Sequence, residues 1–188
     1  MNNPKDKEQP KRKSPRLHGF DYSKGGLYFL TICTQDRKNI LSNVVGEGFP
    51  LPSSSVNPKT ELKLLYCGKV ADKWINKIPE KFPGTYVDCY VIMPNHIHII
   101  LRKTAVMQSG RGDPSPTKTA VASTNSVVGW LKYSITREIN CKTDRTGEKV
   151  FQRSYYDHII RDRDDYYRIY KYVMENPVCW QTDILYVE

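Results

Sequence analysis

Two apolar runs joined by a short turn constrain the fold of this 188-residue chain more than any other feature. Residues 85 to 92, TYVDCYVI, are rich in β-branched and aromatic side chains, and the turn MPN follows them. Residues 96 to 102, HIHIILR, then alternate between two faces, with His96 and His98 on one face and apolar side chains on the other. The stretch predicts an antiparallel pair of strands whose apolar face points to the core.

The two histidines raise the question of what an imidazole pair does in a strand. Strand geometry places His96 and His98 on the same side, about 7 Å apart along the backbone. Neutral imidazole is a common metal ligand, so the pair predicts two ligands of one metal ion. The alternative is two surface histidines on a half-exposed sheet, and the pair alone leaves both open.

Other segments alternate between predicted strands and helices. Strands are predicted at residues 28 to 34 and 155 to 160, and helices at residues 61 to 78, 125 to 140 and 163 to 175. In the first helix the apolar stripe is Leu62, Leu65, Val70, Trp74 and Ile78, with Pro79 expected to end it. Asn125 or Ser126 is expected to cap the second helix and Asp162 the third, which Pro177 ends.

Two stretches do not fit a regular element. Residues 43 to 60 predict a loop or a weak hairpin, and residues 104 to 124 predict a long polar loop. The order β-α-β-β-α-β-α predicts an antiparallel sheet with helices packed on it, which is an α+β domain of the split β-α-β type.

The last predicted helix separates its tyrosines by direction. At 100° per residue, Tyr166 and Tyr170 fall on the core stripe, while Tyr167 points nearly the opposite way. Tyr172 and Asn176 lie four residues apart, so they share a helical face at the margin of that stripe. We therefore expect these two side chains to line one site.

Charge and composition indicate the class of partner. The formal net charge is +9, and the chain contains 13 tyrosines, which suit stacking on unpaired bases. Five widely spaced cysteines form no C-x-x-C pair, which favours a reduced cytoplasmic protein without a disulfide framework or a thiolate zinc site. No apolar run approaches the roughly 18 residues that a membrane helix needs.

The N-terminal residues 1 to 16 form a separate basic segment. They include Lys11, Arg12, Lys13 and Arg16. We expect an arm that orders on DNA, with a solvated tail as the alternative. The chain is thus divided into this arm and a single domain over residues 17 to 188.

Three motifs together resemble a known family. PNHIHIIL, FQRSYYDHIIRD and YKYVMENP look like the HUH single-tyrosine transposases, and the chain is most similar to the REP-associated tyrosine transposases of bacteria. The resemblance extends from about Arg16 to the W-x-x-D of Trp180 and Asp183. It implies a ferredoxin-like fold, with the His-x-His motif on a central strand.

The resemblance also implies the chemistry. Tyr172 takes the position of the nucleophile, and Asn176 that of the third metal ligand beside His96 and His98. The implied reaction is metal-dependent cleavage and transfer of single-stranded DNA at hairpin-forming repeats, through a 5′-phosphotyrosine. Oxygen ligands favour Mg²⁺ or Mn²⁺. The alternative is a DNA-binding or replication-initiator-like protein that keeps the site without mobilising DNA.

Several expectations are less specific. Arg153 and Arg161 flank the strand at residues 155 to 160 and are expected either to hold DNA phosphates or to be ordinary surface charge. His158 is expected to be structural or a phosphate contact. The family resemblance implies a monomer or a homodimer, in the cytoplasm of a bacterium and near its nucleoid.

Overall fold

The protein is described from a computed structural model, which covers residues 25–46, 60–104, 106–108, 117–119, 121–144 and 146–187. The strands are β1 (Gly26–Cys33), β2 (Ser42–Val45), β3 (Glu61–Leu64), β4 (Thr85–Ile92), β5 (His96–Lys103), β6 (Val106–Gln108), β7 (Thr117–Thr119) and β8 (Tyr156–Ile160). The helices are α1 (Tyr66–Ile75), α2 (Ile78–Lys81), α3 (Thr124–Thr143) and α4 (Arg163–Glu175), with 3-10 turns η1 (Gln35–Arg37) and η2 (Trp180–Thr182).

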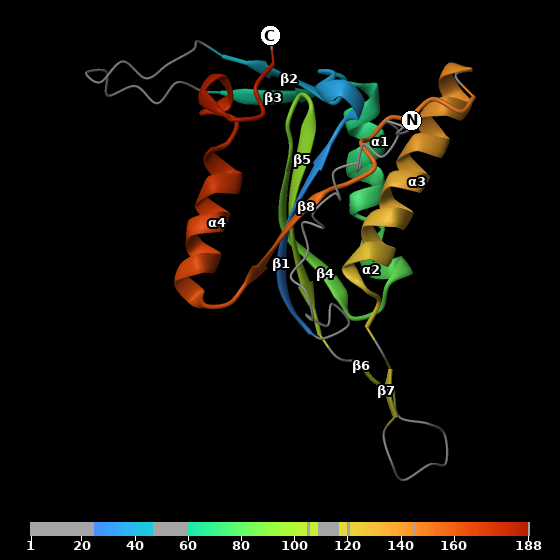
Figure 1. The fold of residues 1–188 in the computed structure, drawn as a ribbon, viewed down its shortest axis with the longest axis vertical. Helices are drawn as coiled ribbons and strands as arrows, with labels where there is room; N and C mark the ends of the chain where they lie inside the picture. Colours follow the sequence, from blue (N-terminus) through green and yellow to red (C-terminus); the bar gives the residue numbers. More distant parts are fainter. Residues whose placement is uncertain are drawn as a thin grey trace, which may run out of the picture.

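Four strands form one antiparallel sheet in the order β4-β5-β1-β8 (Figure 1). The histidine strand β5 is internal, with β4 on one side and β1 on the other. The chain runs β1, α1, β4, β5, α3, β8, α4, which is the split β-α-β order with a further helix. The prediction of an α+β fold with His-x-His on a central strand is confirmed.

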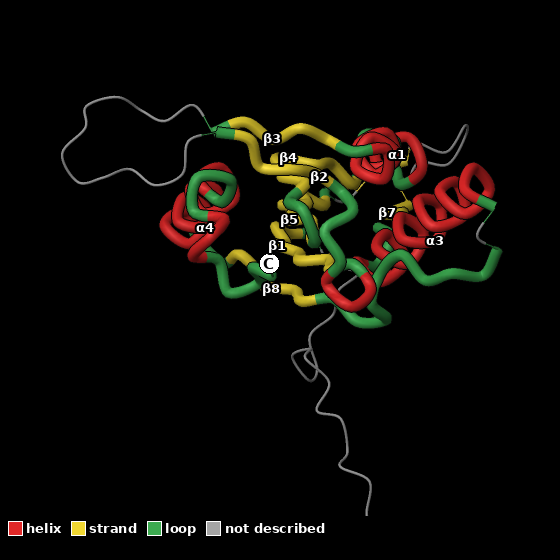
Figure 2. Tube along the Cα trace, turned by 90° about the horizontal axis from the view of Figure 1, so that it is seen from above, coloured by secondary structure: helices red, strands yellow, loops and turns green. Residues whose placement is uncertain are grey.

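Helices cover both faces of this sheet, as the view in Figure 2 shows. On one face, Ile97 and Ile99 of β5 belong to the main core together with side chains of α1 and α3. On the other face, Ile169 and Val173 of α4 form a second buried cluster with sheet residues. His96 and His98 are buried on this face, so the alternative of two surface histidines on a half-exposed sheet is wrong.

The first predicted helix is wrong at both ends. Leu62 lies in β3 and pairs with Val44 of β2, and α1 begins only at Tyr66. Leu62 and Leu64 are two residues apart, a spacing that fits a strand. The backbone pairing with β2 stabilises the strand at this position. Pro79 does not end α1, which stops at Ile75; it lies in the first turn of α2, where a missing N–H costs little.

The other two helices are closer to expectation. α3 is capped by Ser123, whose Oγ accepts a hydrogen bond of 3.1 Å from the backbone N–H of Ser126, so the predicted cap at Asn125 or Ser126 is late. In α4 the predicted cap is confirmed, since Asp162 accepts a hydrogen bond of 2.8 Å from the backbone N–H of Asp165.

Both irregular stretches contribute residues to paired strands. β2, at the start of the stretch at 43 to 60, pairs antiparallel with β3, which begins at Glu61 just after that stretch. Residues 47 to 59, on which the loop or hairpin prediction mostly falls, lie outside the described residues. β6 pairs with β7, so the predicted loop at 104 to 124 is two-stranded in part. No helix within the described ranges is both long and apolar enough to span a membrane.

Candidate metal centre and nucleophile

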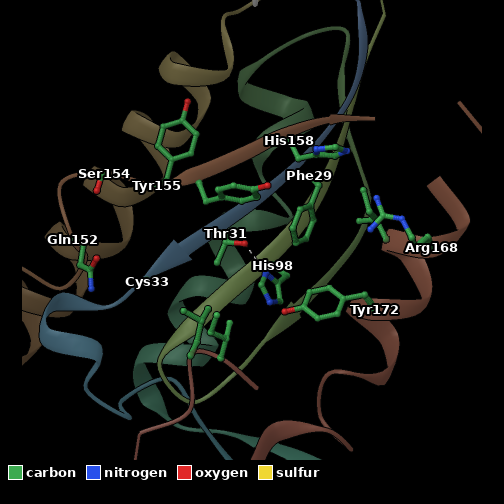
Figure 3. Close-up of a pocket in the computed structure, with 14 residues that line it drawn as sticks. Phe29, Thr31, Cys33, His98, Gln152, Ser154, Tyr155, His158, Arg168 and Tyr172 are labelled. Carbon is green, nitrogen blue, oxygen red and sulfur yellow. Dashed lines mark hydrogen bonds between the residues drawn. The ribbon is translucent and has the colours of Figure 1, made fainter. Parts of the chain in front are cut away.

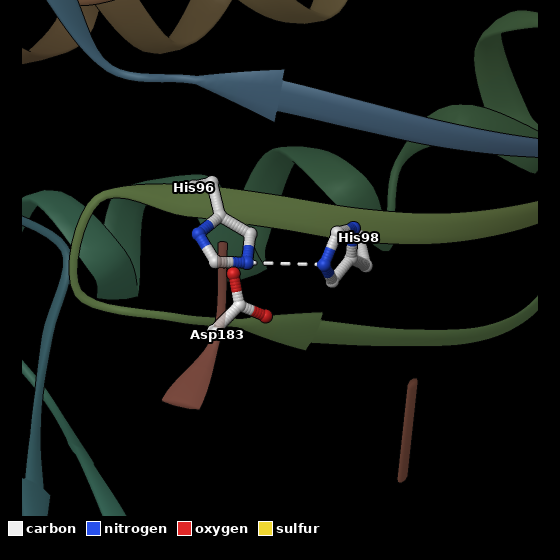
Figure 4. A group of neighbouring side chains, drawn as sticks. All are labelled: His96, His98 and Asp183. Atoms are coloured by element: carbon white, nitrogen blue, oxygen red, sulfur yellow. Dashed lines mark hydrogen bonds between the residues drawn. The ribbon is translucent and has the colours of Figure 1, made fainter. Parts of the chain in front are cut away.

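His96 and His98 bring two imidazole nitrogens together on the face of β5 that α4 covers. Their Nε2 atoms lie 3.0 Å apart, and both side chains are buried (Figure 4). Two nitrogens that each lie about 2.1 Å from one ion, at roughly a right angle, are about 3.0 Å apart. The spacing therefore matches two ligands of a single ion.

Neighbouring side chains hold each ring by its other nitrogen. Nδ1 of His96 lies 2.8 Å from Oδ1 of Asn95, and Nδ1 of His98 lies 2.9 Å from Oγ1 of Thr31. Since Oδ1 of Asn95 can only accept, His96 carries its proton on Nδ1 and presents a lone pair at Nε2. Such partners of the second nitrogen are typical of metal-ligating histidines.

Burial keeps both imidazoles neutral. It lowers the pKa of His96 to about 4, although the Asp183 carboxylate opposes the shift. Burial also lowers the pKa of His98 well below its usual range, and His96 adds to the effect. Neutral imidazole is the form that binds a metal, so the pair is ready to bind one at neutral pH.

Asp183 joins the histidines and was not predicted as a site residue. Ligand atoms of His96, His98 and Asp183 all lie within 4.8 Å of one another, so the group could hold a metal ion. The η2 turn brings Asp183 there, and Trp180 of that turn packs with its ring 5.9 Å from that of His96. The W-x-x-D pattern is the one signal in the sequence that points to this carboxylate.

Asn176 lies beside Asp183, at the C-terminal end of α4. Its side chain is 2% exposed, and its Nδ2 donates a hydrogen bond of 2.6 Å to Oδ2 of Asp183. Its Oδ1 is buried and makes no hydrogen bond. An unsatisfied buried oxygen is costly, and a cation beside it would remove that cost. Two imidazoles and a carboxylate could hold a divalent ion, and the buried amide oxygen of Asn176 is a candidate further ligand.

Tyr172 lies directly against the histidine pair. Its ring centroid is 5.2 Å from that of His98, and its hydroxyl donates a hydrogen bond of 3.2 Å to Oδ2 of Asp183. Burial, followed by the charge of Asp183, raises the pKa of Tyr172 to about 12. The phenol is therefore protonated at neutral pH, and its hydroxyl proton is directed to the carboxylate of Asp183.

The other tyrosines of α4 lie away from the pair. As expected, Tyr166 packs against the second core cluster and Tyr167 is exposed. Tyr167 accepts a hydrogen bond from Arg163. The expectation that Tyr170 packs in the core is wrong, because it is 38% exposed and stacks on Tyr166.

A groove of about 810 Å³ opens from the site (Figure 3). His98, Tyr172, Phe29 and Tyr156 are among the residues that line it, and of the last two Phe29 is buried whereas Tyr156 is exposed. A volume of this size is typical of a ligand-binding pocket. Any molecule bound at the histidine pair therefore has room to extend along the sheet.

The predicted DNA contacts are only partly within the described residues. Lys11, Arg12, Lys13 and Arg16 lie outside them. Arg153 and Arg161 are exposed; Arg161 lines a separate pocket near Tyr166, away from the groove. His158 forms a hydrogen bond of 2.7 Å with Asp165 and is not part of the candidate metal group.

Comparison with known proteins identifies relatives over most of the chain. No family model matches. An uncharacterized protein of Haemophilus influenzae is 30% identical over 184 residues, which cover 94% of this chain and 94% of that protein. A second protein of that organism, provisionally named a REP-associated tyrosine transposase, is 27% identical over 167 residues, covering 84% of this chain and 73% of that one.

A solved structure shows the same fold. It is that of a REP-associated tyrosine transposase bound to a REP hairpin, and it matches with a TM-score of 0.52 and 20% identity. The match covers 87% of this chain and 73% of that one. Sequence and fold agree, and the chain is homologous to the REP-associated tyrosine transposases.

Proposed function

We propose that this protein cleaves single-stranded DNA beside a hairpin and transfers the cut strand, with Tyr172 as the nucleophile. The observation that carries the proposal is the position of Tyr172, whose ring lies 5.2 Å from that of His98. The phenol thus lies beside a candidate metal group and lines a groove.

The residues divide the chemistry between them. A Mg²⁺ or Mn²⁺ ion bound by His96, His98 and Asn176 would polarise the scissile phosphate and offset the charge that develops on it. The Tyr172 oxygen forms a bond to phosphorus while the bond from phosphorus to the 3′ oxygen breaks. The products are a 5′-phosphotyrosine and a free 3′-OH.

The phenol must lose its proton during this step. The hydrogen bond of 3.2 Å from Tyr172 to Asp183 supports Asp183 as the acceptor, a role that no residue could be given from the sequence. The leaving 3′ oxygen takes up a proton. Because the phosphotyrosine conserves the bond energy, the 3′-OH of a second strand can reverse the step and complete a transfer.

The substrate class follows from the family and from the protein surface. The solved relative is bound to a REP hairpin, which supports a hairpin-forming repeat as the substrate here. The net charge of +9 and the basic residues of the N-terminal arm suit a polyanion. Aromatic side chains in the groove suit unpaired bases better than a duplex.

A cleavage assay on matched DNA tests the proposal. The protein is incubated with a hairpin that carries single-stranded flanks, or with the same sequence as a blunt duplex, in Mn²⁺ or in EDTA. We expect a covalent protein–DNA adduct with the flanked hairpin in Mn²⁺ only. Equal adduct formation on the duplex would contradict the proposal, and tight hairpin binding without an adduct would favour the DNA-binding alternative.

A further inference from the structure

We propose that the groove between β8 and α4 is a binding site for one unpaired nucleotide next to the scissile phosphate, with its base stacked on Tyr156. The inference rests on the proposed function and extends it to residues that the cleavage chemistry does not use. Tyr156 would be the stacking surface, and Arg168 and His158 would contact the adjoining phosphate.

The strand register places these residues on the same face as the metal group. Across the sheet, His98 pairs with Thr31, and Thr31 pairs with Tyr156. Residues paired in register point to the same face of a sheet. Tyr156 therefore lies two strands, or roughly 10 Å, from His98 across one continuous surface.

Phe29 forms the floor between the two positions. It is 7% exposed, and its ring centroid lies 5.1 Å from that of His98, 6.1 Å from that of Tyr172 and 6.5 Å from that of Tyr156. Phe29 meets Tyr156 and Tyr172 edge-on, at interplanar angles of 70° and 82°. Tyr156 itself is 55% exposed, so its ring is available to a base.

Polar groups at the rim suit a phosphate. His158 and Arg168 both line the groove, and the carboxylate of Asp165 holds them, accepting from Arg168 and bonding to Nε2 of His158. The side chain of Arg168 is 72% exposed, and its guanidinium has further N–H donors beside the one that Asp165 accepts. None of the described lining residues is itself acidic, and the donors of Arg168 that Asp165 does not use are left for an anionic ligand.

The far wall of the groove is held in place by Lys132. Its Nζ donates hydrogen bonds to the carbonyl oxygens of Gln152 (2.8 Å), Arg153 (3.3 Å) and Ser154 (2.9 Å). Gln152 and Ser154 are lining residues, so the wall is preformed. A strand whose phosphate lies at His98 and Tyr172 has this groove directly beside it.

Fluorescence of a base analogue tests the inference. Hairpins with a single-stranded flank carry 2-aminopurine at one flank position at a time, and the protein carries Tyr172→Phe so that the DNA stays intact. Stacking quenches 2-aminopurine, so we expect quenching at one position beside the cleavage site. Tyr156→Ala should abolish that quenching, whereas Tyr156→Phe should keep it. Tyr133→Ala is the matched control, because Tyr133 is 63% exposed on α3, on the opposite side of the sheet.

Affinity for an abasic flank provides a second test. Fluorescence anisotropy should show roughly 5- to 150-fold weaker binding of the flanked hairpin after Tyr156→Ala. Removing the stacked base from the DNA should weaken binding to the wild type by the same factor. The same removal should leave the affinity of Tyr156→Ala almost unchanged. Independent, additive losses, or quenching that survives Tyr156→Ala, would overturn the inference while hairpin binding persists. Absence of any hairpin binding would instead defeat the proposed function itself, and the inference with it.

Discussion

The hydroxyl of Tyr172 donates a hydrogen bond of 3.2 Å to Oδ2 of Asp183, a residue that follows it by eleven positions. Oδ2 also accepts from Asn176, while Oδ1 of the same carboxylate accepts a hydrogen bond of 2.6 Å from the backbone N–H of Leu185. The C-terminal segment thus fixes a carboxylate that belongs to the candidate metal group and also contacts the proposed nucleophile. The carboxylate raises the pKa of the phenol, yet it is also the acceptor that the phenol needs.

Replacing this carboxylate should separate the two effects. Asp183→Asn removes the charge that, after burial, helps to raise the pKa of Tyr172 to about 12, so that pKa should fall. The absorbance of the phenolate during a pH titration, with Tyr172→Phe as the reference, measures it. Adduct formation at neutral pH should nevertheless slow by roughly 10²- to 10⁴-fold, because the proton acceptor is lost. A rate equal to that of the wild type would show that Asp183 takes no part.

The histidine pair should account for metal binding. Exchanging both His96 and His98 for Ala leaves Asn176 and Asp183 as the remaining candidate ligands. We therefore expect loss of measurable Mn²⁺ binding in isothermal titration calorimetry, together with loss of cleavage. Hairpin binding should weaken without disappearing. His158→Ala is the matched control for the calorimetry, since His158 bonds to Asp165; a loss of Mn²⁺ affinity in that variant would contradict the assignment.

Much of the fold could be predicted from local patterns. The alternation of residues 96 to 102 and the cap at Asp162 correctly predicted β5 and the start of α4. The start of α1 could not be predicted, because Leu65 at its N-cap provides no side-chain hydrogen bond and β3 depends on a partner distant in sequence.

Only the parts of the site that lie within one helix or one strand could be predicted from the sequence. Asn176 and Tyr172 share a face of one helix, so spacing alone brings them together. Asp183 lies in a turn after that helix, where no periodicity applies, and only tertiary packing brings it to His96. Thr31, which holds His98, could not be predicted either, because its position beside His98 depends on the register between β1 and β5.

At Gly68, helix α1 lies in close contact with the backbone of Leu41. A Cβ at Gly68 would lie 2.0 Å from the carbonyl oxygen of Leu41, whereas a Cβ at Gly129 would meet no atom within 4 Å. Gly68→Ala should therefore lower the free energy of unfolding by roughly 1–3 kcal/mol. Gly129→Ala, inside α3, should raise it by roughly 0.5–1 kcal/mol. Urea denaturation of both variants measures this, and equal effects would refute the close contact.

The basic arm remains a prediction that salt dependence can test. A variant with glutamine in place of all four basic residues should bind the hairpin more weakly and with less sensitivity to salt. The four residues are Lys11, Arg12, Lys13 and Arg16. If all four contact phosphates, the slope of log K against log salt should fall by about 3. Binding at several salt concentrations measures the slope. An unchanged slope would mean that these residues form only a solvated tail.

The identity of the covalently modified residue tests the central claim most directly. The adduct formed with a flanked hairpin in Mn²⁺ is digested, and mass spectrometry locates the nucleotide. We predict a phosphodiester on Tyr172, no adduct in Tyr172→Phe, and an unchanged adduct in Tyr167→Phe, whose side chain is exposed elsewhere on α4. Hairpin affinity should be nearly the same in all three proteins. An adduct that persists in Tyr172→Phe, with the DNA attached to Tyr167 or another residue, would contradict the account.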